Sequence, residues 1–126
     1  MKRVGIVGLG LIGGSIGIAL RARGWRVSYD DPYVEIGEAR RRGAADERGV
    51  AGVDLTVVAT PLDVAIEVVR NAAGPATSVC SVMAPLRAAA RGRFVAGHPM
   101  AGSQESGLAA ARGDLFERAR WFVDED

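Results

Sequence analysis

The amino-acid sequence predicts an α/β fold built on a doubly wound, mostly parallel sheet. Short apolar runs alternate along the chain with longer stretches whose apolar residues recur at helical spacing. The short runs are apolar at consecutive positions, as in parallel strands that are buried on both faces and joined by right-handed crossovers. The length of 126 residues, with 48% hydrophobic and 25% charged residues, is typical of one globular domain, which we expect to span 1–126.

The first part of the chain predicts a strand, a helix and a second strand. Residues 2–7 form an apolar run that ends at Gly8, as expected of a buried strand. From Leu11 onward the apolar residues follow a helical period until Gly24, a residue that commonly ends helices. The second strand is expected over 25–29, where acidic residues and a proline then close it.

The middle of the chain predicts helix, strand and helix. Residues 34–42 are rich in Glu, Ala and Arg and are followed by Gly43, which indicates a helix and its end. Residues 54–61 are the clearest buried strand, because β-branched residues occupy the centre and Pro61 stops it. Residues 64–73 return to the helical period.

The last part of the chain predicts two more strand and helix pairs and a final strand. We expect a strand over 77–82, then a short helix rich in Ala and Arg, then a strand over 93–96. A glycine-rich loop is expected over 97–107, followed by a helix over 108–118 and a strand over 120–123.

A glycine-rich turn lies between the first predicted strand and helix. Gly8, Gly10 and Gly13 have the spacing G-x-G-x-x-G inside a β-α-β unit. The first glycine permits a tight turn, the second lets the backbone approach a pyrophosphate, and the third lets the helix pack against the strand. Backbone N–H groups at the helix start, around Leu11 and Ile12, would face the phosphates. This pattern predicts a Rossmann-type dinucleotide-binding domain.

An acidic residue at the end of the second strand predicts which dinucleotide binds. Asp30 lies about 20 residues after the glycine turn, where a carboxylate accepts hydrogen bonds from the ribose hydroxyls of NAD. The same charge, with Asp31 beside it, would repel the 2′-phosphate of NADP, so NAD is the expected cofactor. The other interpretation is that residues 30–32 only form a turn.

The apolar start of the chain also resembles a signal peptide or a membrane span. Residues 4–20 are uncharged and follow two basic residues, but six of these seventeen positions are glycine and no cleavage site follows. A buried strand followed by a phosphate-binding turn is therefore the better interpretation, and no contact with a membrane is expected.

Charge and cysteine content exclude several other classes of protein. The net charge is +1, and the arginine runs at 21–23 and 40–42 are near predicted helix ends, so no nucleic-acid partner is expected. One cysteine and one histidine allow no intrachain disulfide, and no metal site is expected. A reduced, cytoplasmic location is the default for such a chain.

The only histidine lies in a glycine-rich stretch that carries a family resemblance. The segment GHPMAGSQESG at 97–107, with GLGLIGGS at 8–15 and VVATP at 57–61, resembles the prephenate and arogenate dehydrogenases of tyrosine biosynthesis. The likeness runs from Lys2 to about Val123. It implies an NAD(P)-dependent oxidative decarboxylation, in which C4 of the prephenate ring gives a hydride to the nicotinamide, carbon dioxide leaves and the ring becomes aromatic.

The resemblance assigns roles to individual residues of this chain. His98 matches the histidine that accepts the proton of the ring hydroxyl, a role suited to an imidazole at neutral pH. Ser81 matches an active-site serine that contacts the substrate hydroxyl and the histidine, and Thr60 and Pro61 match residues beside the nicotinamide. The loop residues that match the border of the substrate site are Ser103, Gln104 and Ser106.

Two features depart from the family pattern. Where the family usually reads D-V-G-S-V-K, residues 78–83 read S-V-C-S-V-M, so Met83 replaces a lysine near the substrate. Family members also continue into a C-terminal helical domain that forms the dimer and supplies arginines for the substrate carboxylates. The present sequence ends at Asp126, so we expect that domain to be absent and a separate helical domain or a homodimer partner to complete the site.

Three interpretations of function stay open at this point. The chain is the dinucleotide-binding half of a prephenate or arogenate dehydrogenase, a non-catalytic NAD-binding fragment or module, or part of another Rossmann oxidoreductase such as an imine reductase. The choice between prephenate and arogenate depends on contacts that the helical domain helps to form. Activity of the isolated chain is a separate question from family membership.

Overall fold

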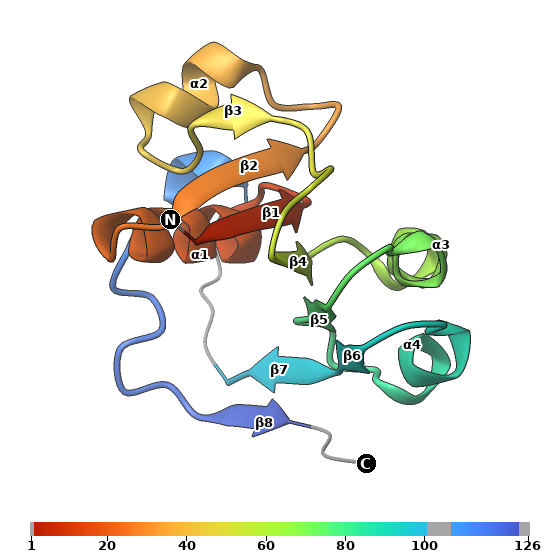
Figure 1. The fold of residues 1–126 in the computed structure, drawn as a ribbon. Coiled ribbons are helices and arrows are strands. Elements are labelled where there is room, and N and C mark those ends of the chain that lie inside the picture. The colour runs from red at the N-terminus through yellow and green to blue at the C-terminus, as the bar shows by residue number, and fades with distance from the viewer. Residues whose placement is uncertain (1, 101–106, 124–126) are drawn as a thin grey trace.

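The computed structural model describes residues 2–100 and 107–123, and its centre is a six-stranded parallel sheet. The strand order is β3-β2-β1-β4-β5-β6 (Figure 1), which is the order of dinucleotide-binding Rossmann folds. The strands are β1 (Arg3–Val7), β2 (Arg26–Asp30), β3 (Glu47–Arg48), β4 (Leu55–Val58), β5 (Ala76–Ser78) and β6 (Phe94–Val95). The predicted doubly wound, parallel sheet is thereby confirmed.

Helices cover both faces of this sheet. They are α1 (Leu11–Ala22), α2 (Ile36–Arg41), α3 (Leu62–Asn71) and α4 (Ala84–Ala89). On one face, α1 and α2 pack against β1 and β2 around a cluster that includes Ile6, Tyr29 and Ala39. On the other face, α3 and α4 lie side by side over β4 and β5 around Val58 and Leu86 (Figure 1).

Part of one face of the sheet, beside β1 to β3, has no covering helix. The connection from β3 to β4 is a short loop, and it lies directly on β1, since a Cβ added to Gly5 would be 2.9 Å from Val50 Cβ. Without a covering helix, the nearby positions are charged: Arg3 starts β1, Arg26 starts β2, and Glu47 lies in β3. The expectation that every strand is apolar on both faces is therefore wrong here.

Two short strands were not predicted from the sequence. β3 has two charged residues and no apolar run to identify it. β7 (Gly97–Pro99), in the segment expected to be a loop, pairs antiparallel with β8 (Trp121–Val123), so that His98 lies opposite Phe122. Pairing with a distant strand, which no local pattern encodes, makes β7 a strand.

Two predicted elements are shorter than expected. β5 ends at Ser78 instead of continuing to 82, because its neighbour β4 ends at Val58, directly opposite Ser78. The predicted helix over 108–118 is only a 3-10 turn at Leu108–Ala110 followed by hydrogen-bonded turns. There the N–H of Arg112 donates to the buried Ser15 hydroxyl of α1 at 3.0 Å, so a tertiary contact replaces helical bonding.

The basic runs at the helix ends take part in intramolecular contacts. Arg21, near the end of α1, donates to the carboxylate of Asp46 at 3.0 Å, and Arg40 of α2 donates to the Asp46 carbonyl at 2.9 Å. Arg42 pairs with Glu38 one helical turn earlier. Within the residues that the structure describes, no helix has the length and apolar character needed to cross a membrane.

Candidate functional site

The glycine turn between β1 and α1 has the geometry that its sequence predicts. Gly8 has φ +94°, and a Cβ there would be 2.5 Å from the Ala59 carbonyl oxygen. A Cβ on Gly13 would be 1.9 Å from the Gly8 carbonyl oxygen, so the helix is packed directly on the turn. A Cβ on Gly10 would meet nothing within 4 Å. The turn is closed around its first and third glycines and open at the second.

The start of α1 is free to attract an anion. Gly10 is the N-cap, no side chain caps the helix, and its first turn contains no acidic residue. The N–H of Gly14 makes the first intrahelical bond, to the Gly10 carbonyl at 2.8 Å, so the N–H groups of Leu11, Ile12 and Gly13 precede the helical ladder. Unpaired N–H groups and the positive end of the helix dipole favour a phosphate at this place.

A pocket of about 620 Å³ opens beside this turn, where the chain connections leave the sheet in opposite directions. We call it the switch-point pocket. Its lining residues come from the glycine turn, the end of β2 and the connection from β4 to α3: Val7, Gly8, Gly10, Asp30, Asp31, Pro32, Tyr33, Ala59, Thr60, Pro61, Asp63, Val64 and Val68. Five residues predicted to bind the cofactor, distant in the chain, meet there: Gly8, Gly10, Asp30, Thr60 and Pro61.

The charge of the switch-point pocket is negative. Asp30, Asp31 and Asp63 line it, and none of the described lining residues is basic. The side chain of Asp30 is exposed at the end of β2, whereas both carboxylate oxygens of Asp31 accept backbone hydrogen bonds. The pocket therefore offers an open carboxylate and no cation for an additional phosphate group.

Exposed apolar side chains flank the same pocket and were not predicted from the sequence. Tyr33 is 92% exposed and Val64 of α3 is 45% exposed, although both are large and hydrophobic. Neither lies in a motif, so only the fold brings them to one pocket. Exposed apolar surface beside a polar turn is suited to a flat aromatic ligand.

Thr60 contributes a hydroxyl that lacks a partner. Among the described residues, the Thr60 Oγ1 and Ser78 Oγ atoms are buried without a hydrogen bond. Thr60 also lines the switch-point pocket, and its carbonyl accepts a bond from the Cys80 thiol at 3.5 Å. Burial raises the pKa of the Cys80 thiol, and the Val79 backbone only partly opposes this effect. Cys80 is therefore a neutral packing residue at this edge.

His98 and Ser81 lie near the carboxyl end of β5. His98 is half-buried on β7, and its Nδ1 is 3.4 Å from the Val79 carbonyl oxygen just beyond β5. Ser81 follows two residues later and is exposed. The hydrogen bonds of the described residues do not join the two side chains. Three other predicted residues, Ser103, Gln104 and Ser106, lie outside the described residues.

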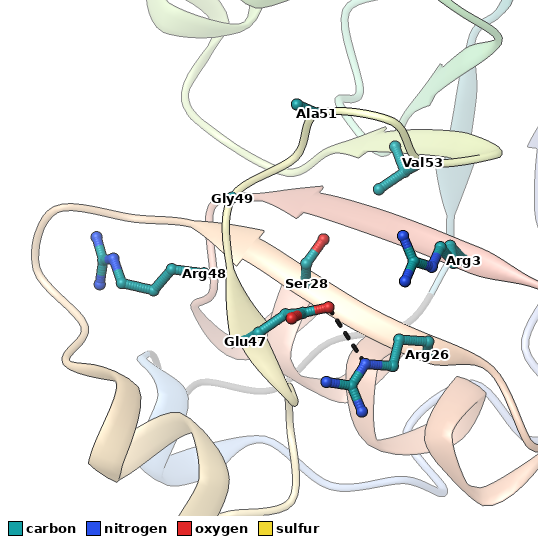
Figure 2. A pocket seen from close by; sticks show the side chains of 8 residues that line it. All are labelled: Arg3, Arg26, Ser28, Glu47, Arg48, Gly49, Ala51 and Val53. Atoms are coloured by element: carbon teal, nitrogen blue, oxygen red, sulfur yellow. Dashed lines mark hydrogen bonds and ion pairs between the residues drawn. The ribbon is translucent and has the colours of Figure 1, made fainter.

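A second pocket, of about 290 Å³, lies away from the glycine turn (Figure 2). It is formed where the short β3–β4 loop leaves the sheet uncovered, and its main polar contact is Arg26 Nε to Glu47 Oε1 at 3.2 Å. Its lining extends from Arg3 and Arg26, which start their strands, to Gly49 just after β3, so the pocket lies on the uncovered face of the sheet. Ligands of open parallel sheets bind at the carboxyl edge, which favours the switch-point pocket. Across the described part of the chain, no cluster of acidic, His or Cys side chains could hold a metal ion.

Comparisons with known proteins agree with this fold. Residues 16–124 match the family model for the nucleotide-binding domain of prephenate dehydrogenase. The chain is 28% identical to the prephenate dehydrogenase of Lactococcus lactis subsp. cremoris, covering 100% of this chain and 42% of that enzyme. The chain thus spans less than half the length of that relative.

Two solved structures of dehydrogenases are similar over almost the whole chain. The Aquifex aeolicus prephenate dehydrogenase, in complex with hydroxyphenyl propionate and NAD+, has a TM-score of 0.84 at 26% identity, with coverage of 100% of this chain and 51% of that one. The Synechocystis arogenate dehydrogenase has a TM-score of 0.81 at 27% identity, with coverage of 97% and 49%. With a family match over most of its length, a Rossmann strand order and an open glycine turn, this chain belongs to the prephenate dehydrogenase family and contains its nucleotide-binding domain.

Proposed function

We propose that this chain binds NAD in the switch-point pocket and forms the dinucleotide-binding half of a prephenate or arogenate dehydrogenase. The observation that carries the proposal is the glycine turn, which is closed at Gly8 and Gly13 and open only at Gly10. Open space at this one glycine, in front of an uncapped helix start, fits the close approach of a pyrophosphate.

The other parts of NAD have partners along the same pocket. The exposed carboxylate of Asp30 would accept hydrogen bonds from the adenosine ribose, and Tyr33 and Val64 would flank the adenine. Thr60 and Pro61, which line the same pocket, would lie beside the nicotinamide half. Because the pocket is acidic and its described lining has no basic side chain, it favours NAD over NADP.

The proposed reaction is the oxidative decarboxylation of a cyclohexadienol carboxylate. NAD, when bound, supplies the hydride acceptor. His98 would take the proton of the ring hydroxyl as the carbonyl forms, while Ser81 would hold that hydroxyl. A proton on Nδ1 of His98 would point to the Val79 carbonyl, which would leave Nε2 as the free base. Ser103, Gln104 and Ser106 would border the substrate.

Binding of the substrate carboxylates requires cations from outside this pocket. A separate helical domain or a homodimer partner would supply them, in a cytoplasmic enzyme of tyrosine biosynthesis. The named activities of the Lactococcus lactis and Synechocystis relatives support the two candidate substrates, prephenate and arogenate.

A non-catalytic NAD-binding module is the second candidate. Met83 stands near Ser81, where the family pattern usually has a lysine, and removes a positive charge from the substrate side. This candidate requires the same NAD pocket but no role for His98.

Titration calorimetry with NAD and NADP tests the binding proposal. We expect NAD to bind and NADP to bind at least about tenfold more weakly, since a 2′-phosphate would meet Asp30. Failure of both dinucleotides to bind would refute the proposed function.

Turnover distinguishes the two candidates. Prephenate-dependent NADH formation is measured at 340 nm with the chain and, where turnover needs it, with an added helical domain. His98→Asn should then lower kcat by roughly 100-fold or more with unchanged NAD affinity. Equal turnover by His98→Asn and the wild type would refute the role of His98, whereas NAD binding with no NADH formation under either condition would favour the non-catalytic module.

A further inference from the structure

The two adjacent aspartates at the end of β2 have different surroundings. Asp30 has an exposed side chain, and no side-chain hydrogen bond or ion pair engages it among the described residues. The Asp31 carboxylate is fully engaged: Oδ2 accepts the N–H of Leu9 at 2.8 Å, and Oδ1 accepts the N–H of Tyr33 at 2.9 Å. The two neighbouring carboxylates therefore face different partners.

Asp31 bridges two walls of the switch-point pocket. Leu9 lies between the first two glycines of the turn, and its side chain is completely buried. Tyr33 carries the exposed ring on the other side of the pocket. A carboxylate that accepts one bond from each wall sets the spacing between the turn and the adenosine side.

Arg48 of β3 fixes the segment that carries Asp31. Its guanidinium donates to the carbonyls of Asp31 at 3.3 Å and Val34 at 2.7 Å, and to the Tyr29 hydroxyl at 2.8 Å. It also stacks 4.9 Å from the centre of the Tyr29 ring. Figure 2 shows the side chain pointing away from the Arg26–Glu47 pair. The connection from β2 to α2 is thus held at both ends, and Asp31 is positioned before any ligand binds.

We propose that Asp31 is a positioning residue that holds the glycine turn in its binding shape, and that discrimination between NAD and NADP belongs to Asp30 alone. This inference rests on the proposed binding of NAD. It differs from the sequence-based expectation, in which both carboxylates repel the 2′-phosphate. Both oxygens of the Asp31 carboxylate already accept backbone N–H groups, whereas the Asp30 carboxylate is open to the ligand.

The test compares Asp31→Ala, Asp31→Asn and Asp30→Ala with the wild-type chain by NAD and NADP calorimetry. Asp31→Ala should lower the affinities for NAD and for NADP by the same factor, about tenfold, because both dinucleotides bind to the same glycine turn. Asp31→Asn keeps one acceptor oxygen and should recover part of the lost affinity. The ratio of the NAD affinity to the NADP affinity should be unchanged in this variant. Asp30→Ala should instead lower that ratio. An NAD affinity within twofold of the wild type in Asp31→Ala, or a changed ratio in Asp31→Asn, would overturn the proposal.

Hydrogen exchange measured by NMR gives a readout that is independent of ligand. The Leu9 amide should exchange at least about tenfold faster in Asp31→Ala, because its acceptor is lost. The Gly8 amide, bonded to the Asp30 backbone carbonyl at 3.0 Å, is the internal control and should be unchanged. Unchanged Leu9 exchange refutes the positioning role. A wild-type chain that binds no dinucleotide refutes the proposed function instead, and the exchange result still decides the role of Asp31.

Discussion

At the scale of single residues, the three glycines of the turn are subject to different constraints. Gly8 and Gly13 are required by the backbone, since a Cβ at either would lie within 2.5 Å of a carbonyl oxygen. Gly10 has open space around the Cβ position, so the fold itself does not require glycine there. We therefore expect a ligand, and not the fold, to require glycine at this position.

Two alanine substitutions separate these constraints. Gly13→Ala should lower the free energy of unfolding by about 3 kcal/mol, because the helix must move away from the turn. Gly10→Ala should lower it by less than about 1 kcal/mol but weaken NAD binding by about tenfold or more, since the methyl group occupies the pyrophosphate position. Urea denaturation and calorimetry measure the two quantities. Equal loss of stability in both variants would contradict this assignment.

The single cysteine offers another prediction at this scale. Burial raises the pKa of the Cys80 thiol from its ordinary value of 9.0, so the thiol is protonated at neutral pH. We expect a disulfide reagent to react with the native chain at pH 7 at least about tenfold more slowly than with the chain in denaturant. Rapid stoichiometric labelling of the native chain would show that the thiol is exposed and ionised.

At the scale of elements, the Asp46 carboxylate connects helix α1 with strand β2. Its carboxylate accepts bonds from the Arg21 Nε of α1 and from the Val27 N–H of β2, at 3.0 and 2.8 Å. Burial acts to raise the pKa of Asp46, but the Val27 and Arg21 bonds outweigh it and the net pKa is lowered. No sequence motif marks this residue, because its partners are 25 and 19 residues away.

Asp46→Asn should therefore destabilise the fold in a pH-dependent manner. At pH 7 we expect a loss of about 2 kcal/mol in the free energy of unfolding, from one charged hydrogen-bond acceptor. A lowered pKa in the folded state stabilises the chain above the ordinary value of 3.8, and this contribution is lost as pH falls through the lowered value. The difference from the wild type should therefore shrink as the pH falls below about 5. Glu67→Ala, which removes an exposed pair on α3, is the control and should cost less than about 0.5 kcal/mol.

At the scale of the whole molecule, the proposed NAD site lies at the carboxyl edge of the sheet. The switch-point pocket takes residues from β1, β2, the β4–α3 connection and α3, so bound NAD would hold both halves of the sheet together. The second pocket, on the uncovered face, is lined only by residues of the β1–β3 half and its loop (Figure 2).

NAD should therefore raise the melting temperature of the whole chain. At a concentration 100 times its Kd, a ligand specific for the native state adds about 2.7 kcal/mol, or roughly 10 °C for a chain of this size. Differential scanning fluorimetry measures the shift. NADP at the same concentration should give a smaller one, and Gly10→Ala, with NAD binding about tenfold weaker, should remove about half of it or more. An equal shift with NADP would argue against discrimination by Asp30.

The sequence by itself determined the parts of this protein that depend on local pattern. The glycine spacing, the acidic end of β2 and the buried apolar strands predicted a parallel Rossmann sheet, and the segment around His98 predicted the family. Tertiary structure alone decided the rest. The pairing of β7 with β8, the packing of the β3–β4 loop on Gly5, and the hydrogen bond from the Leu9 N–H to the Asp31 carboxylate join residues distant in the chain. Such contacts form because the sheet brings strand ends together, and helical or strand periodicity within one segment contains no information about which distant backbone group it will meet.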